Sequence, residues 1–115
     1  MMQGSFLRFY VHEDHRHRGG LVWEWLLEQG NRLGLRGGSA FREIAGFGRH
    51  HQVHQARLFE PPGSVTVEIE FIVTEDEARG LFDLLRREGV RLFYAYLPAR
   101  FGVINADAAD PAEDP

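Results

Sequence analysis

The stretch GFGRHHQVH, residues 46–54, lies near the centre of the chain and decides how the segments on either side are connected. The preceding residues, 39–47, have strand-forming composition, and two glycines around one aromatic residue let a strand end abruptly with its backbone accessible. Residues 49–60 are polar and carry no helix signal before the turn sequence Pro61-Pro62-Gly63. The sequence therefore predicts a long hairpin whose connecting arm, residues 49–64, projects from the fold.

Three further segments predict strands. Alternation is clearest in residues 65–73, where one face would be entirely apolar. Residues 5–12 have two largely apolar faces, and residues 92–97 predict a last strand that ends before Pro98. A short edge piece is expected at residues 101–104.

Two segments predict helices. Residues 21–33 carry an apolar stripe of helical period formed by Val22, Trp23, Leu26, Gly30 and Leu33. The second helix begins at a capping box formed by Thr74 and Glu77 and ends at Gly89. Trp25 lies off the first stripe, so we expect it either at a subunit boundary or beneath the connection formed by residues 12–20.

The order strand, helix, strand, strand, helix, strand is that of a ferredoxin-like α+β sandwich. Right-handed crossovers place both helices on one face of a four-stranded antiparallel sheet. The other face is left open, with Arg8 near Glu68 and Glu70 if the first and third strands are neighbours. This face is too apolar to remain in water, which favours oligomerisation.

Length and composition predict a single domain over residues 1–104 and an acidic, disordered tail over residues 105–115. Four of the 17 acidic residues lie in this tail, so the acids in the rest of the chain equal the 13 bases in number. This balance gives no sign of a nucleic-acid-binding surface. Cysteine is absent, and neither a secretory start nor an apolar membrane span is evident, so we expect a cytoplasmic protein.

The chain resembles the PII-like family known as domain of unknown function 190, within the PII and CutA-like superfamily. The resemblance covers residues 5–98 and rests on motifs distributed along them. These motifs are His12-Glu13-Asp14, Gly19-Gly20-Leu21, Trp23-Glu24, Gly37-Gly38-Ser39-Ala40-Phe41-Arg42, Ile44-Ala45-Gly46-Phe47-Gly48, His54, Leu58, Val67-Glu68-Ile69 and the segment 89–92.

The resemblance implies a signalling protein that forms a homotrimer and binds a small anionic ligand in clefts between subunits. An adenine nucleotide is the ligand that PII relatives commonly bind, and the arm would contact a regulated partner. The loop base corresponds to Gly46, Phe47, Gly48 and Arg49, whose backbone N–H groups can meet phosphate oxygens. The chain contains no lysine, so the cations expected to contact the ligand are Arg49, Arg91 and Arg100.

Two other classes of function stay open at this stage. His12, His15 and His17, with Glu13 or Asp14 as a further ligand, have donor types suited to a divalent metal, as expected of a CutA-like trimer. A ligand-free adaptor for a membrane transporter is the other alternative. An enzyme is not expected, because Ser5, Ser39 and Ser64 are the only serines and none lies in a nucleophile motif.

Overall fold

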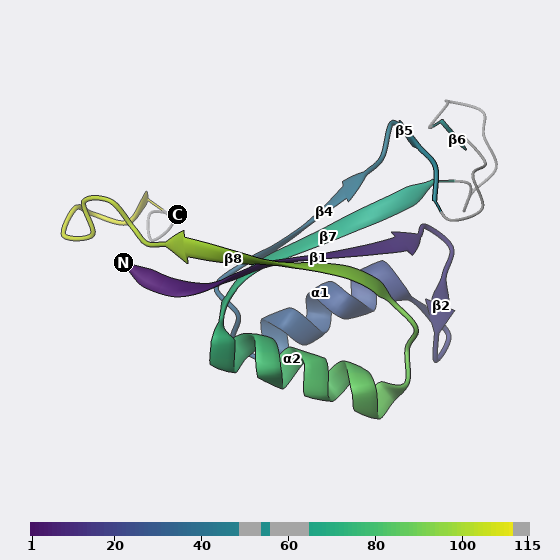
Figure 1. Cartoon of the computed structure of the whole chain (residues 1–115), viewed down its shortest axis with the longest axis horizontal. Coiled ribbons are helices and arrows are strands. Elements are labelled where there is room, and N and C mark those ends of the chain that lie inside the picture. The colour runs from purple at the N-terminus through teal and green to yellow at the C-terminus, as the bar shows by residue number, and fades with distance from the viewer. Residues whose placement is uncertain (49–53, 56–64, 112–115) are drawn as a thin grey trace.

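The computed structural model describes residues 1–48, 54–55 and 65–111. Its main sheet is four-stranded and antiparallel, with the order β4-β7-β1-β8, and two helices cover one of its faces (Figure 1). The strands are β1 (Met2–His12), β4 (Gly38–Arg42), β7 (Thr66–Thr74) and β8 (Phe93–Phe101), and the helices are α1 (Val22–Arg32) and α2 (Glu75–Glu88). This arrangement confirms the predicted ferredoxin-like class.

Two short ribbons extend the connections at one end of the sheet (Figure 1). In the first, β2 (Arg16–His17) pairs with β3 (Gly20–Leu21) between β1 and α1. In the second, β5 (Ala45–Gly46) pairs with β6 (His54–Gln55). The second ribbon confirms a hairpin after β4, and residues 49–53 and 56–64 of the arm lie outside the described residues.

The hydrophobic core lies between the two central strands and the helices. Alternate residues of β1 and β7 point to the helix side, and the register places Leu7 opposite Phe71 and Phe9 opposite Ile69. The buried apolar residues are Leu7, Phe9, Val11, Val22, Leu26, Val65, Val67, Ile69, Phe71, Val73, Ala78, Leu81 and Leu85. Burial of these side chains is the main favourable contribution to folding.

The start of α2 follows directly from its sequence. The backbone N–H of Glu77 donates to Thr74 Oγ1, and the backbone N–H of Thr74 donates to Glu77 Oε1. Gly89 ends the helix with a φ of 68°, in the left-handed region that glycine adopts without a steric penalty. The predicted capping box and helix stop are both confirmed.

Two predicted strand boundaries are wrong. The strand expected at residues 39–47 leaves β7 after Arg42, because the chain then pairs with β6 instead. The strand expected to stop before Pro98 continues to Phe101, with Pro98 opposite Ser5 on β1. Because β8 is an edge strand, only one side of its backbone is paired, and an edge position tolerates proline.

The sheet face away from the helices, here called the open face, carries many apolar side chains. Phe41, Phe93 and Leu97 expose 52%, 72% and 45% of their surfaces on it. Near its centre Arg8 Nε lies 3.3 Å from Glu68 Oε1 and 3.4 Å from Glu70 Oε1, which confirms the predicted charge cluster.

The chain after β8 leaves the sheet at the end where the N-terminus lies (Figure 1). Asn105 has a φ of 57°, and its carbonyl accepts a hydrogen bond from the N–H of Ala108, which closes a turn. Residues 112–115 of the predicted tail lie outside the described residues. None of the helices in the described part of the chain combines the length and apolar character needed to cross a membrane.

Two glycines, one in each helix, provide a matched test of the core. A Cβ on Gly30 would lie 2.5 Å from Phe71 Cε1, whereas a Cβ on Gly80 would meet no atom within 4 Å. We expect Gly30→Ala to lower the free energy of unfolding by about 1–3 kcal/mol through overpacking. Gly80→Ala should raise it by about 0.5–1 kcal/mol through helix propensity. Urea denaturation measures both values, and a stabilised Gly30→Ala variant would contradict the packing of α1 on β7.

Candidate ligand-binding site

The glycine-flanked turn predicted to bind the ligand lies at the end of the sheet where β1 finishes. Gly46 pairs with His54 in the short ribbon, and Phe47 and Gly48 follow it with largely exposed surfaces. Arg49 lies outside the described residues. The described part of the turn therefore presents accessible backbone, as the sequence predicted.

The two other predicted cations lie at opposite ends of the sheet. Arg91 lies between α2 and β8, at the end that carries the β5–β6 ribbon (Figure 1). Arg100 is paired with Gln3 at the start of β1. β1 runs from Met2 to His12, so at about 3.3 Å per residue its length separates these ends by roughly 33 Å. One subunit therefore does not bring Arg100 together with the glycine-flanked turn or with Arg91.

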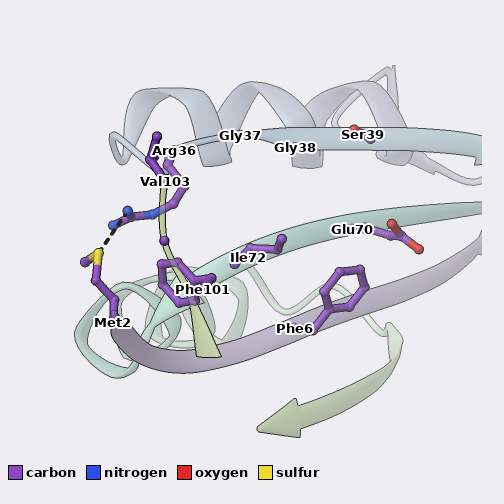
Figure 2. Close-up of a pocket in the computed structure, with 11 residues that line it drawn as sticks. Met2, Phe6, Arg36, Gly37, Gly38, Ser39, Glu70, Ile72, Phe101 and Val103 are labelled. Atoms are coloured by element: carbon purple, nitrogen blue, oxygen red, sulfur yellow. Dashed lines mark hydrogen bonds between the residues drawn. The ribbon is translucent and has the colours of Figure 1, made fainter. Parts of the chain in front are cut away.

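A hollow of about 400 Å³ lies at the Arg100 end of the open face. Figure 2 shows its side chains coming from the start of β1, the start of β4, the end of β7 and the end of β8. The lining combines apolar side chains with the backbone of two consecutive glycines and a few polar groups: Met2, Phe6, Arg36, Gly37, Gly38, Ser39, Glu70, Ile72, Phe101, Gly102 and Val103.

Arg36 is the cation that lines this hollow, and several contacts orient it. Its Nη2 donates to Glu77 Oε1 at 3.4 Å, and its Nη1 donates to Met2 Sδ at 3.4 Å (Figure 2). Its guanidinium carbon lies 4.9 Å from the centroid of the Phe101 ring. Burial acts to raise the pKa of Glu77, but hydrogen bonds from Thr74 and the charge of Arg36 outweigh burial and lower it. Arg36 is thus held by an ionised carboxylate at the rim.

The composition of the hollow suits a flat, partly apolar ligand that carries negative charge. Phe6 and Phe101 supply aromatic surface, Arg36 supplies cationic donors, and a Cβ on Gly37 would meet no atom within 4 Å. A mostly apolar lining with a few placed polar groups is typical of small-molecule sites.

No sequence pattern predicted this hollow. Gly37-Gly38 belongs to one of the motifs that carry the family resemblance, and its two accessible glycine backbones are the one local signal of the hollow. Gly38 has a packing reason as well, since a Cβ there would lie 2.6 Å from Phe71 Cε1. No local sequence pattern indicates that Arg36 contacts Met2 and Phe101, because these contacts depend on pairing between strands that are far apart in the sequence.

The predicted metal site is not assembled within the described residues, where no group of three His, Asp or Glu side chains could hold an ion. His12 ends β1 with an exposed side chain, and the carbonyl of His15 accepts a hydrogen bond from the N–H of Val22. His17 instead lies with its Nε2 3.0 Å from Glu88 Oε1. In the structure α2 supplies His17 with a partner that sequence spacing does not reveal.

The His17 contact confirms one of the two positions predicted for Trp25. The imidazole and indole rings meet edge to face with centroids 4.9 Å apart. Trp25 therefore packs beneath the β2–β3 ribbon, and His17 and Glu88 fasten that ribbon to the end of α2. Arg18 Nε also lies 3.5 Å from Glu88 Oε1.

Comparison with known families settles the relationship that these features suggest. The family model described as "Uncharacterized ACR", domain of unknown function 190, matches residues 4–89, which is most of the chain. The chain belongs to the DUF190 family. This membership confirms the resemblance that the sequence motifs indicated.

Relatives of this DUF190 chain include a UPF0166 protein from Aquifex aeolicus, strain VF5. It is 28% identical over 86 residues, which cover 75% of this chain and 82% of the relative. Among solved structures, a putative PII-like signaling protein from Thermus thermophilus superposes with a TM-score of 0.61 at 16% identity. That comparison covers 86% of this chain and 91% of the other.

A second similar structure is CPII, a nitrogen regulatory PII-like protein from Thiomonas intermedia K12, bound to ADP, AMP and bicarbonate. It has a TM-score of 0.56 at 16% identity, over 84% of this chain and 88% of its own. At these identities the structural comparisons establish a shared PII-like fold.

The contact between His17 and Glu88 generates a pH-dependent prediction. The hydrogen bond from His17 is the largest cause of the lowered pKa of Glu88; burial opposes it, and the charges of Arg18, His17 and Arg87 reinforce it. A lowered pKa means that the stabilisation is present above the ordinary glutamate value of 4.5 and is lost as pH falls through the folded-state pKa. We expect Glu88→Gln to lower Tm at pH 6, with the difference shrinking below pH 4.5.

The matched control is Glu28→Gln, which removes an exposed carboxylate that pairs with Arg32 on α1. Exposed i,i+4 pairs contribute little, so this variant should melt close to the wild type. Thermal melts followed by circular dichroism between pH 4 and pH 7 measure both differences. An equal effect of the two substitutions at pH 6 would contradict a fastening role for Glu88.

Proposed function

We propose that this DUF190 protein is a PII-like regulatory protein that forms a homotrimer and binds a small anionic ligand between subunits. The observation that carries the proposal is the separation of the candidate ligand groups. The glycine-flanked turn and Arg91 lie at one end of the sheet, while the hollow and Arg100 lie at the other. Both sets serve one ligand only when they come from neighbouring subunits.

The open face supports the assembly that this arrangement requires. Exposed apolar side chains such as Phe41, Phe93 and Leu97 are costly in water, and contiguous patches of this kind mark association surfaces. Closed rings are the common outcome when one surface of a subunit meets a different surface of the next. A trimer built in this way places the hollow of one subunit near the turn of its neighbour.

An adenine nucleotide is the ligand class that we assign to the inter-subunit site. The aromatic rings of Phe6 and Phe101 provide apolar surface for a base, and Arg36 provides charge-assisted donors for phosphate. The backbone N–H groups around Gly46 and Gly48 offer further donors to an anion. The structure of CPII, in which ADP and AMP are bound to a protein of similar fold, supports this choice.

The role assigned to the protein is regulatory binding rather than catalysis. Ligand occupancy at the base of the 49–64 arm would change the affinity of that arm for a partner, by favouring one of its conformations. A membrane transporter is one partner class of this type. The divalent-metal function is not retained, because the described residues do not assemble its ligands.

Isothermal titration with ADP, AMP, ATP and cyclic AMP tests the ligand, and Arg36→Gln tests the site. We expect at least one of these nucleotides to bind with one site per subunit. Loss of a charge-assisted hydrogen bond costs about 1.5–3 kcal/mol, so Arg36→Gln should weaken binding roughly 10- to 100-fold.

The control is Arg32→Gln, which removes an exposed guanidinium on α1 and should leave the affinity unchanged. A thermal melt of each variant establishes that it remains folded, because Arg36 also pairs with Glu77. Absence of binding by all four nucleotides to protein of trimeric mass would refute the nucleotide ligand. A monomeric mass at micromolar concentration would refute the inter-subunit site itself.

A further inference from the structure

The charged cluster on the open face has more negative than positive charge. Glu68 and Glu70 lie two residues apart on β7 and therefore point to the same side of the sheet. Arg8 on β1 lies opposite Glu70, and its Nε is 3.3 Å from one carboxylate and 3.4 Å from the other. Two carboxylates thus share one guanidinium.

The position of the Arg8 guanidinium favours neither of the two carboxylates. Arg8 Nε is buried and, among the described residues, makes no hydrogen bond of good geometry, although it lies within ion-pair distance of both acids. The guanidinium carbon of Arg8 lies 4.7 Å from the centroid of the Phe6 ring, which directs the rest of the group along the apolar surface. Arg8 therefore offsets one negative charge and leaves the second without an equivalent partner.

Within residues 1–48 and 65–111, no arginine other than Arg8 lies opposite the two acids in the sheet. Arg36 lines the same hollow as Glu70 but pairs with Glu77, and His12 follows Tyr10 on the same face of β1. On β4, Ser39 and Phe41 are the residues opposite Glu70 and Glu68. Glu43, just beyond β4, adds negative charge, and Tyr10 on β1 lies opposite Glu68. Arg42 points to the other side, where its guanidinium binds Glu13 in a bidentate pair.

The pKa of Glu68 agrees with this charge imbalance. It is raised above the ordinary glutamate value, with burial as the largest cause, followed by a hydrogen bond with Glu70 and the charge of Glu70. Arg8 acts in the opposite direction but does not reverse the shift. Since each acidic side chain is still 22% exposed in the subunit, covering the face would strengthen the burial effect.

We propose that the open face closes on copies of this chain with uptake of a proton by the Glu68–Glu70 pair, so that assembly is controlled by pH. This inference rests on the proposed function, because it requires the open face to be the subunit interface. A single proton shared by the two carboxyl groups leaves one negative charge beside Arg8. The cluster is then neutral and can be buried at far lower cost than with both acids ionised.

The direction of the pH effect follows from linkage. Burial on assembly disfavours the ionised form of the two carboxylates, so the assembled state binds more protons than the separate subunits do. Assembly is therefore strongest at low pH and weakens as pH rises through the pKa of the assembled state. Each proton taken up changes the association constant by up to about tenfold per pH unit, or up to about a thousandfold for three subunits.

Sedimentation equilibrium of the full chain between pH 6.0 and 8.5, at constant salt, tests this coupling. The wild type should dissociate progressively as pH rises. Glu68→Gln and Glu70→Gln each remove the second carboxylate, so both variants should assemble tightly with little dependence on pH. Arg8→Gln leaves two acids without the guanidinium and should require a lower pH to assemble.

The control is Glu24→Gln, which removes one exposed carboxylate from α1 and changes the net charge of the subunit by the same amount. It should keep the pH dependence of the wild type. A trimer whose association constant does not change with pH would overturn the proton coupling while leaving the assembly intact. The proton coupling would also be overturned if the association of the Glu68→Gln and Glu70→Gln variants depended on pH as strongly as that of the wild type. A monomer throughout the range would overturn the proposed trimer as well.

Discussion

The structure depends on an imbalance between the two faces of one β-sheet. The helices α1 and α2 cover one face and bury the apolar side chains of its two central strands, with Leu7 and Ile69 at 0% exposure. The other face carries apolar side chains beside a charged cluster and has no helix layer, so Phe93 and Leu97 remain in contact with water. Sheets of this type are stable when a second layer covers them. In the proposed function, neighbouring copies of this chain supply that second layer.

The same imbalance explains where a ligand can bind. A hollow lies at one end of the open face, and the glycine-flanked turn lies at the other end of the sheet. In the proposed trimer, copies packed around the open face would bring such ends together, so the ligand and the assembly would use the same surface. The Glu68–Arg8–Glu70 cluster lies near the centre of that surface and is the group through which we propose that protons affect assembly.

Local sequence patterns predicted the fold and part of the site. The alternation in 65–73 and the Thr74 capping box each depend on neighbouring residues, and the positions of Glu68, Glu70 and Arg8 followed once the strand order was inferred. Features that depend on contacts between residues far apart in the sequence were not predicted. His17 is bound by Glu88, 71 residues away, which no metal-ligand spacing could indicate. The hollow around Arg36 likewise needs β1 and β8 to pair before its lining exists.

Covering of the open face can be measured directly by hydroxyl-radical footprinting at micromolar protein concentration. In the subunit, Phe93 and Leu97 expose 72% and 45% of their surfaces, and Leu33, outside the open face, exposes 41%. We expect Phe93 and Leu97 to be protected in the assembled protein and to become oxidised on dilution, whereas Leu33 should react equally at all concentrations. Oxidation of Phe93 and Leu97 in proportion to their exposure at every concentration would contradict a sheet covered by its own copies.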